Sequence, residues 1–284
     1  MGFFILATTF KLYNMKIEEA YPKRIICLTE ECTETLYLLK EEKRIIGVSN
    51  YAVRPKRAKK ENNVVCTFIN AKFDKIIALK PDLVIGFSDI QADIAKKLIK
   101  EGITVWINNY RSVHGIKIMI NQIGLLVGKH SESIKIVNEI EENIKNIKKR
   151  NSNKLVKPKV YFEEWFDPLI SSIQWVSEII EICGGRNIYD AENAKSLAAD
   201  RIIEDENEII IFNPDIILVS WCGKKFKKDK MVNRKGWNSI NAIKNDDIHE
   251  IDSSIILQPG PAALTDGLII ISNIIDNWYQ KNKN

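Results

Sequence analysis

The sequence has little of what metal sites are built from. Its 284 residues contain three histidines, His114, His130 and His249, and each stands alone in the chain. The five cysteines are scattered and form no C-x-x-C pair. Cysteines of this kind are typically small residues of the buried core. A structural zinc site, in contrast, needs four ligands placed close together. We therefore expect no metal bound directly by the protein and no cofactor of its own.

The motifs of common enzyme classes are missing as well. The chain carries no G-x-S-x-G, no P-loop and no G-x-G-x-x-G. Glu163, Glu164 and Asp167 form an acidic cluster, but no spacing rule identifies a catalytic carboxylate pair there. We expect a protein without catalytic residues. The alternative left open is a cytoplasmic enzyme or chaperone that handles a metal or cofactor with Glu163, Glu164 and Cys222.

Long apolar runs are also absent, since no run approaches the ~20 residues of a membrane span. The first ten residues are apolar, but they lack a basic n-region, a small-x-small cleavage site and a lipoprotein cysteine. We expect a cytoplasmic monomer, with a periplasmic or membrane-associated location as the alternative. The net charge of +5 is modest and predicts no nucleic-acid partner.

A strongly helical stretch lies in the middle of the chain, from Ser112 to Arg150. Its apolar residues recur at helical spacing, with lysine, glutamate and asparagine on the other faces. Gly128 to Ser131 offers an interruption, because glycine can end a turn and Ser131 can cap a following helix. At ~1.5 Å per residue the span would reach about 50 Å. We expect residues 112–157 to form a stiff linking helix between two lobes.

The two flanking halves resemble each other. Pro81-Asp82 precedes the apolar run from Leu83, and Pro214-Asp215 precedes the apolar run from Ile216, at an offset of 133 residues. In both copies a short helix, a Pro-Asp stop and a strand without alternation follow one another, which indicates strands buried on both faces. The sequence predicts an α/β protein of two doubly wound lobes with mainly parallel sheets, at residues 22–111 and 158–284.

Ligands of open parallel sheets bind beyond the carboxyl ends of the strands. That rule selects polar and aromatic residues that follow the predicted strands of both lobes, and opposed faces of this kind would form a cleft. The acidic residues could instead serve as partners of a helix dipole without binding a ligand. The basic runs could instead form a solvent-exposed face. The predicted ligand-binding residues are Thr29, Glu30, Tyr51, Arg54, Ser88, Gln91, Glu163, Glu164, Trp165, Asp167, Trp221, Cys222, Lys225 and Gln258.

Several of these segments carry a family resemblance. The stretches Arg24 to Leu39, Ile76 to Ile85 with its ALKPDLVI core, and Ser220 to Lys225 resemble the cobalamin and iron-chelate substrate-binding proteins of ABC importers. The similarity spans about residues 22 to 280 and is strongest to a branch carrying EEWFDPLIS, SWCGKKF and LQPGPAALTDGL. It implies the helical-backbone, class III fold of periplasmic binding proteins, with a corrinoid or metal chelate as the small-molecule ligand.

The resemblance also implies an ABC permease as a possible partner. Family members commonly present an acidic residue from each lobe to permease arginines, just before each Pro-Asp motif. Asp74 stands at the first position, while Glu206 and Glu208 flank Asn207 at the second. Ala262 stands where cobalamin binders of this family often have arginine. A third interpretation is an interaction module that binds partners through its basic faces.

Overall fold

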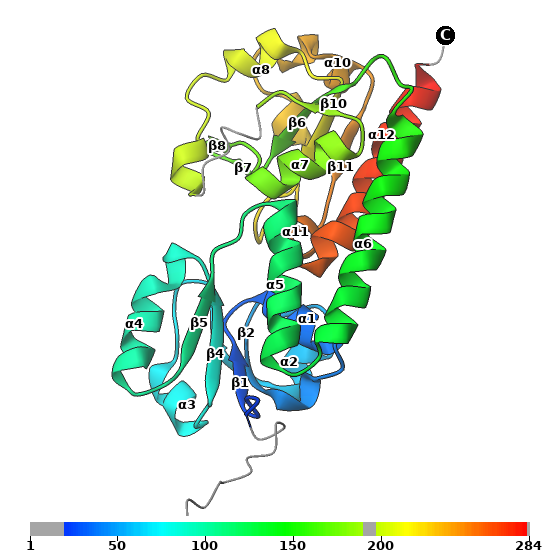
Figure 1. Cartoon of the computed structure of the whole chain (residues 1–284). Coiled ribbons are helices and arrows are strands. Elements are labelled where there is room, and N and C mark those ends of the chain that lie inside the picture. The colour runs from blue at the N-terminus through cyan, green and yellow to red at the C-terminus, as the bar shows by residue number, and fades with distance from the viewer. Residues whose placement is uncertain (1–19, 190–196, 283–284) are drawn as a thin grey trace, which may run out of the picture.

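The computed structural model describes residues 20–189 and 197–282, which form two α/β lobes stacked end to end (Figure 1). The N-terminal lobe is built on a sheet with strand order β3-β2-β1-β4-β5. Its neighbouring strands pair in parallel, and nearly all residues of β1 and β4 are buried. The strands are β1 Ile25–Cys27, β2 Ile45–Ser49, β3 Asn63–Cys66, β4 Leu83–Phe87 and β5 Val105–Asn108.

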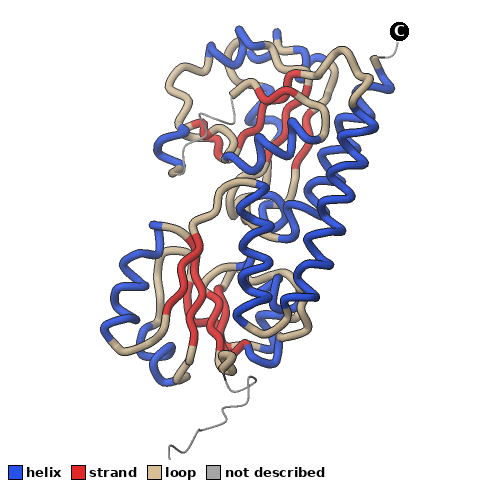
Figure 2. Tube along the Cα trace, in the orientation of Figure 1, coloured by secondary structure: helices blue, strands red, loops and turns tan. Residues whose placement is uncertain are grey.

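Short helices cover both faces of this sheet (Figure 2). The Pro81-Asp82 stop works as expected, because α3 ends before it and Asp82 accepts backbone hydrogen bonds from Lys23 and Arg24 at the start of β1. The sequence did not predict strand β3, because the strand is short, follows a basic run and begins at polar asparagines. The helices are α1 Glu30–Leu38, α2 Ala58–Glu61, α3 Phe73–Ala78 and α4 Ala92–Lys100.

The central helical stretch is two helices rather than one rod. Helix α5, Val113–Leu126, packs against α6, His130–Asn151, and the chain reverses between them at Gly128, where φ is +72°. The expectation of a single 50 Å rod is therefore wrong, and the interruption read from Gly128 is confirmed. Helix α6 alone runs from the N-terminal lobe to the C-terminal lobe, a reach of about 33 Å for 22 residues (Figure 1).

The C-terminal lobe repeats the parallel architecture with strand order β11-β10-β6-β9. The second Pro-Asp stop again separates a helix, α8, from a fully buried strand, β10. The strands are β6 Lys159–Glu163, β7 Trp165–Phe166, β8 Leu169–Ile170, β9 Arg186–Asn187, β10 Ile216–Val219 and β11 Ile248–Glu250. The helices are α7 Gln174–Ile182, α8 Asn207–Phe212, α9 Lys228–Val232, α10 Asn241–Lys244, α11 Ser253–Ile256 and α12 Leu268–Lys281.

The β7-β8 hairpin and the π-helical turn Ala263–Gly267 were not expected from the sequence. In the chain, the hairpin comes directly after β6, and the π-helical turn comes directly before α12. Two-residue strands and a single π turn carry no periodicity that a sequence pattern can reveal.

The two lobes share a core. One hydrophobic cluster continues from Ile25 and Leu36 of the N-terminal lobe through α5 and α6 to Trp175 and Ile271 of the C-terminal lobe. Polar contacts also join the lobes, because the Glu178 carboxylate of α7 accepts the Val113 backbone N–H at 2.6 Å. A shared core of this kind resists large hinge motion, since opening it would expose apolar surface to water. The gap between the lobes is therefore held at a nearly fixed width.

Candidate functional site

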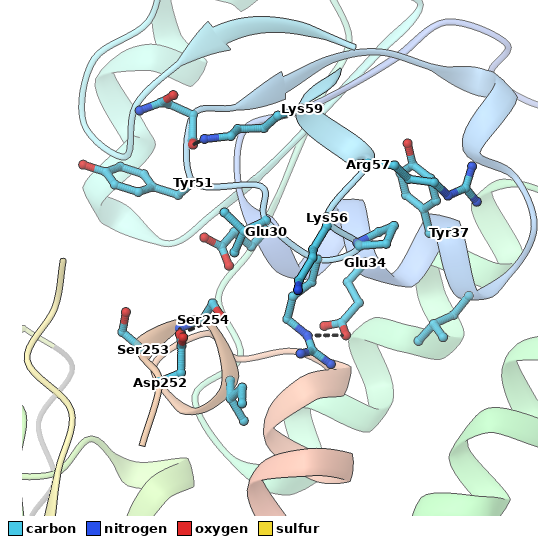
Figure 3. A pocket seen from close by; sticks show the side chains of 16 residues that line it. Glu30, Glu34, Tyr37, Tyr51, Lys56, Arg57, Lys59, Asp252, Ser253 and Ser254 are labelled. Carbon is cyan, nitrogen blue, oxygen red and sulfur yellow. Dashed lines mark hydrogen bonds and ion pairs between the residues drawn. The ribbon is translucent and has the colours of Figure 1, made fainter. Parts of the chain in front are cut away.

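A pocket of about 1010 Å³ lies between the lobes, at the carboxyl ends of β1, β2 and β11 (Figure 3). The N-terminal lobe supplies helix α1 and the loop after β2, and the C-terminal lobe supplies the segment after β11. Its volume is at the upper end of the range for small-molecule sites. The polar groups that line it include Glu30, Glu34, Asn50, Tyr51, Arg54, Lys56, Lys59, Asp252, Ser253 and Ser254.

Glu30 and Glu31 open helix α1 beneath this pocket, where their carboxylates face the helix N-terminus. Both side chains are buried, with 6% and 1% of their surface exposed, and one oxygen of each has no hydrogen-bond partner. Burial, followed by the charges of Glu31 and Glu34, raises the pKa of Glu30 to about 8. Burial also raises the pKa of Glu31 to about 7, against a hydrogen bond from the Thr29 hydroxyl. Near neutral pH the pair therefore holds at least one proton.

Arg54 anchors the loop after β2 to both lobes. Its Nε lies 3.0 Å from Glu34 Oε1, and its Nη2 lies 2.6 Å from Asp266 Oδ2 in the π-helical turn. Glu34 Oε2 also accepts the Ala262 backbone N–H at 3.1 Å. These bonds occupy the guanidinium with protein carboxylates, so Arg54 lines the pocket mainly as a clamp between the lobes.

The C-terminal lobe also contains a row of aromatic rings, which are not among the residues that line the pocket. Rings of Trp165, Phe166, Trp221 and Phe226 follow one another with centroid separations of 5.2, 4.5 and 5.1 Å. The Lys224 ammonium lies 4.8 Å from the Trp165 ring centroid and 5.1 Å from that of Phe166. Trp221 is only 4% exposed, so the expectation that it contacts a ligand is corrected to a core role. Trp165 remains half-buried and is the exposed end of this row.

The two acidic residues at the end of β6 are already paired. Glu163, the last residue of β6, is fully buried and binds Arg234 at 2.6 and 3.0 Å, while the Trp221 Nε1–H donates to it at 3.0 Å. The partly exposed Glu164 binds Arg201 at 2.6 and 3.2 Å. Both carboxylates therefore have a structural role, and a buried carboxylate such as Glu163 is stable only with such a partner. Their predicted role as ligands stays a prediction.

Three residues predicted as ligands in the N-terminal lobe are also structural. The buried Thr29 hydroxyl donates to Glu31, and the Ser88 hydroxyl accepts the Ile90 backbone N–H. Gln91 is fully buried and bonds the backbone of Phe87, Leu28 and Phe68. Buried polar groups in strand-end loops are needed to satisfy the backbone, and the strand-end rule does not distinguish them from ligands.

The other predicted residues do not line the pocket. Asp167 and Lys225 are exposed, and Gln258 is half-buried in the turn before α12. Cys222 is exposed, and burial of its sulfur followed by the nearby charges of Glu164 and Glu30 raises the pKa of its thiol. Of the fourteen predicted residues, the pocket itself brings together Glu30, Tyr51 and Arg54.

The sequence reasoning missed the contribution of the last strand. Asp252, Ser253 and Ser254 directly follow β11 and line the pocket, so the strand-end rule applied to β11 would have found them. Asp252 also caps α11, accepting the Ser254 backbone N–H at 2.8 Å. The partners Arg201 and Arg234 had no sequence signal, because they lie 37 and 71 residues from the carboxylates they bind.

The described residues show neither a cluster of metal ligands nor a helix suited to span a membrane. Within residues 20–189 and 197–282, no group of three or more histidine, cysteine or acidic side chains is arranged to hold a metal ion. No helix in these ranges has the length and apolarity needed to cross a bilayer. The apolar first ten residues lie outside the described part of the chain.

Comparison with known proteins gives consistent matches. A family model described as periplasmic binding protein matches residues 25–255. A Bacillus subtilis protein, the uncharacterized ABC transporter substrate-binding lipoprotein YvrC, is 29% identical over 84% of this chain and 76% of its own. A vitamin B12-binding protein of Vibrio vulnificus is 24% identical over 91% and 92%. The crystal structure of a possible iron-binding, periplasmic solute-binding protein of Staphylococcus epidermidis aligns with a TM-score of 0.74 at 25% identity, over 89% and 98%.

Proposed function

Because the chain belongs to the periplasmic binding protein family, we propose that it holds a corrinoid or a related metal chelate in the pocket between its lobes. It is a substrate-binding protein of the kind that serves ABC importers, and the expectation of a non-enzymatic protein is confirmed by that family. The expected class III fold is confirmed by structures of the same family. The ligand class follows from relatives named as vitamin B12-binding and possible iron-binding proteins.

The observation that carries this proposal is the pocket itself. It is lined from both lobes, it lies at the carboxyl ends of parallel strands, and its volume suits a macrocycle rather than a small ion. Tyr51, which lines the pocket and is 46% exposed, supplies aromatic surface for a planar ring. Hydroxyls, carboxyls and lysines around it supply partners for the polar rim of a chelate.

The enzyme or chaperone alternative finds no support in the arrangement of its residues. Glu163 and Glu164 are held in ion pairs with Arg234 and Arg201, so neither is placed as a free acid or base. The raised pKa of Cys222 keeps its thiol protonated at neutral pH, and a protonated thiol is a poor nucleophile and metal ligand.

A permease would dock on the two outer acidic positions. Asp74 is exposed in the first turn of α3, and Glu206 and Glu208 are exposed at the start of α8. The two helices belong to different lobes, so one partner would span the gap (Figure 1). Charge reversal at Asp74 and Glu206 together should abolish ligand-stimulated ATPase activity of the cognate importer in liposomes while leaving ligand affinity unchanged. Unchanged stimulation would overturn this docking role.

The expected cytoplasmic location is not supported by the comparisons. The family is named for the periplasm, and the Bacillus relative is named as a lipoprotein. We therefore place the proposed receptor outside the cytoplasmic membrane, where it would deliver its ligand to the permease. Fractionation of the native cells, with the protein detected in the cytosol alone, would contradict this placement.

Isothermal titration with dicyanocobinamide, cyanocobalamin and hemin tests the ligand class. The proposal predicts one binding site per chain for at least one of the two corrinoids. A double variant that fills the pocket, Ser253→Trp with Ser254→Trp, should abolish this binding, and Lys145→Ala on the exposed face of α6 is the matched control. Binding of hemin alone would redirect the proposal to porphyrin chelates, and heat from none of the three would overturn it.

A further inference from the structure

We propose that Glu30 selects the ligand of this pocket by donating a hydrogen bond from a neutral carboxyl group. Its partner would be an uncharged acceptor such as a carboxamide oxygen, and a ligand carboxylate would be rejected at the same place. This inference rests on the proposed function, because it requires a ligand that lies between the lobes. The inference adds to the proposed function the chemical class of the ligand group that would bind at the start of helix α1.

One carboxyl oxygen of Glu30 has no hydrogen-bond partner among the described residues. The side chain is 94% buried as 6% remains exposed, its Oε2 is out of contact with solvent, and no described group hydrogen-bonds that oxygen. Glu30 nevertheless lines the pocket, and Figure 3 shows its carboxyl directed toward the space in front of Tyr51 and Ser253. An unsatisfied buried polar group is unfavourable, and a ligand partner would remove that penalty.

The charges around Glu30 are predominantly acidic. Helix α1 contributes Glu31 and Glu34, and the segment after β11 contributes Asp252. The loop after β2 contributes Arg54, whose guanidinium is engaged by Glu34 and by Asp266. Among the described residues, no ion pair to Glu30 itself forms. A second negative charge at this place, whether from Glu30 or from a ligand carboxylate, would be unfavourable.

The remaining groups that face Glu30 do not reverse this balance. Lys56, Arg57 and Lys59 line the same pocket, but Arg57 is paired with Glu42 and Glu61, and the Lys59 ammonium donates to the Asn50 carbonyl at 2.8 Å. Burial raises the pKa of the Cys222 thiol, so it carries no charge near pH 7. The pKa of Glu30, raised to about 8 by burial and then by Glu31, Glu34 and Asp252, keeps its proton in place at neutral pH. A protonated carboxyl has one hydrogen-bond donor, which is the group that Glu30 has for an acceptor of a ligand in the pocket that it lines.

A matched pair of probes separates the two kinds of ligand rim. Dicyanocobinamide carries carboxamides around the corrin ring, and dicyanocobyrinic acid carries carboxylates on the same ring. At pH 6.5 we expect the wild-type chain to bind cobinamide at least tenfold more tightly. Glu30→Gln, which keeps a neutral donor, should stay within about threefold of wild type, whereas Glu30→Ala should lose roughly tenfold, the value of one hydrogen bond to a buried group.

The pH profile provides the second readout. For wild type the cobinamide affinity should be constant below pH 7 and fall toward pH 9, approaching tenfold per pH unit once Glu30 has lost its proton. The profile of Glu30→Gln should be flat over this range. Glu31→Gln is the comparison, because Glu31 is buried but does not line the pocket. Its variant should keep the decline, which should begin at lower pH because the Glu31 charge helps to raise the pKa of Glu30.

Opposite results would overturn the inference. A wild-type affinity that rises with pH, together with a loss in Glu30→Gln, would show that the subsite takes a cation. Equal binding of both probes would show that Glu30 does not select. If wild type binds neither probe, the corrinoid function fails, and a ligand-free carbon-13 NMR titration of the Glu30 carboxyl decides its protonation separately. A midpoint near 8 supports a neutral donor, and a midpoint near 4.5 excludes it.

Discussion

The two walls of the gap have the same strand architecture but opposite chemistry. In the C-terminal lobe the two acids at the end of β6 each have an arginine partner, as Glu163 has Arg234 and Glu164 has Arg201. On the N-terminal wall Arg54 binds Glu34 and Asp266, whereas Glu30 forms no ion pair among the described residues. The carboxylates of the C-terminal lobe are therefore paired. The N-terminal wall carries Lys56, Arg57 and Lys59 at the pocket and still leaves Glu30 without a cation bound to it in the described part of the chain.

Stability and ligand binding therefore depend on different groups of the molecule. Paired charges hold a fold together, whereas an unpaired buried carboxyl costs stability and persists where a ligand can use it. A planar chelate between the walls would stack against the aromatic side and hydrogen-bond the acidic side. Variants on the two walls should consequently fail in different ways.

Breaking a complete pair on the C-terminal wall should give the largest loss of stability. Arg234→Ala leaves the fully buried Glu163 carboxylate without its cation, which typically costs about 3–5 kcal/mol. Urea denaturation should show this decrease in the free energy of unfolding. The double variant Arg234→Ala with Glu163→Gln should recover part of it, since no buried charge is left. A loss below about 1 kcal/mol in the single variant would contradict this description of the wall.

Neutralising an acid on the N-terminal wall should have the opposite sign. The folded pKa of Glu31, about 7, lies above its ordinary value of 4.5, so folding takes up a proton between these values. The stabilising contribution of the protonated group is complete below pH 4.5 and is lost as pH rises through 7. Glu31→Gln should thus be more stable than wild type at pH 8, by about 1–2 kcal/mol. The gain should shrink toward pH 5, and a thermal-melting series would measure both values.

A gain that is equal at both pH values would show that Glu31 carries no extra proton in the folded state. Asp93→Asn is a suitable comparison, because Asp93 is exposed on helix α4, away from the pocket. That variant should show little dependence on pH above 5. The contrast between the two substitutions then isolates the effect of burial.

Removing the exposed end of the aromatic row should affect binding rather than folding. Trp165 is half-buried, and one aromatic contact contributes about 1.5 kcal/mol at most, so Trp165→Ala should weaken cobinamide binding roughly tenfold. Its free energy of unfolding should change little. Trp221→Ala should do the reverse, because Trp221 is 4% exposed and fills the core. Titration calorimetry measures binding and urea denaturation measures stability for both variants. A stability loss in Trp165→Ala, or an unchanged stability in Trp221→Ala, would contradict the roles assigned to them.

The smallest predicted effect concerns Lys224. Its ammonium lies over the Trp165 and Phe166 rings and faces the gap, where a cation–π contact contributes about 0.5–1 kcal/mol. Lys224→Ala should weaken binding of a carboxylate-bearing chelate such as hemin by roughly two- to fivefold and leave cobinamide nearly unaffected. Lys235→Ala, on the exposed surface, is the matched control. A loss shared equally by both ligands would contradict the charge-specific role.

The fold was largely predictable because its signals are local. The Pro-Asp stops at 81–82 and 214–215 fixed the start of β4 and β10, and the period between them predicted two lobes. The long helix was misread because α5 and α6 have similar apolar spacing, and only Gly128 marks the reversal. Spacing within a helix says nothing about the direction of the next one.

The site was less predictable because it depends on pairing across the chain. Glu30 and Glu163 look alike in sequence, each an acid at or just beyond the end of a strand. Arg234 lies 71 residues from Glu163 and makes that carboxylate structural, while Glu30 has no such cation. Strand ends identified the right edge of each sheet, and the distribution of distant arginines decided which acids remain available to a ligand.

A crystal structure of the full chain grown with dicyanocobinamide tests the central claim most directly. The account predicts the corrin ring between the lobes, against Tyr51 and Trp165, with a ring carboxamide oxygen within hydrogen-bond distance of the Glu30 carboxyl. A ring bound outside the gap, or a gap closed by direct contact of the two walls, would contradict it.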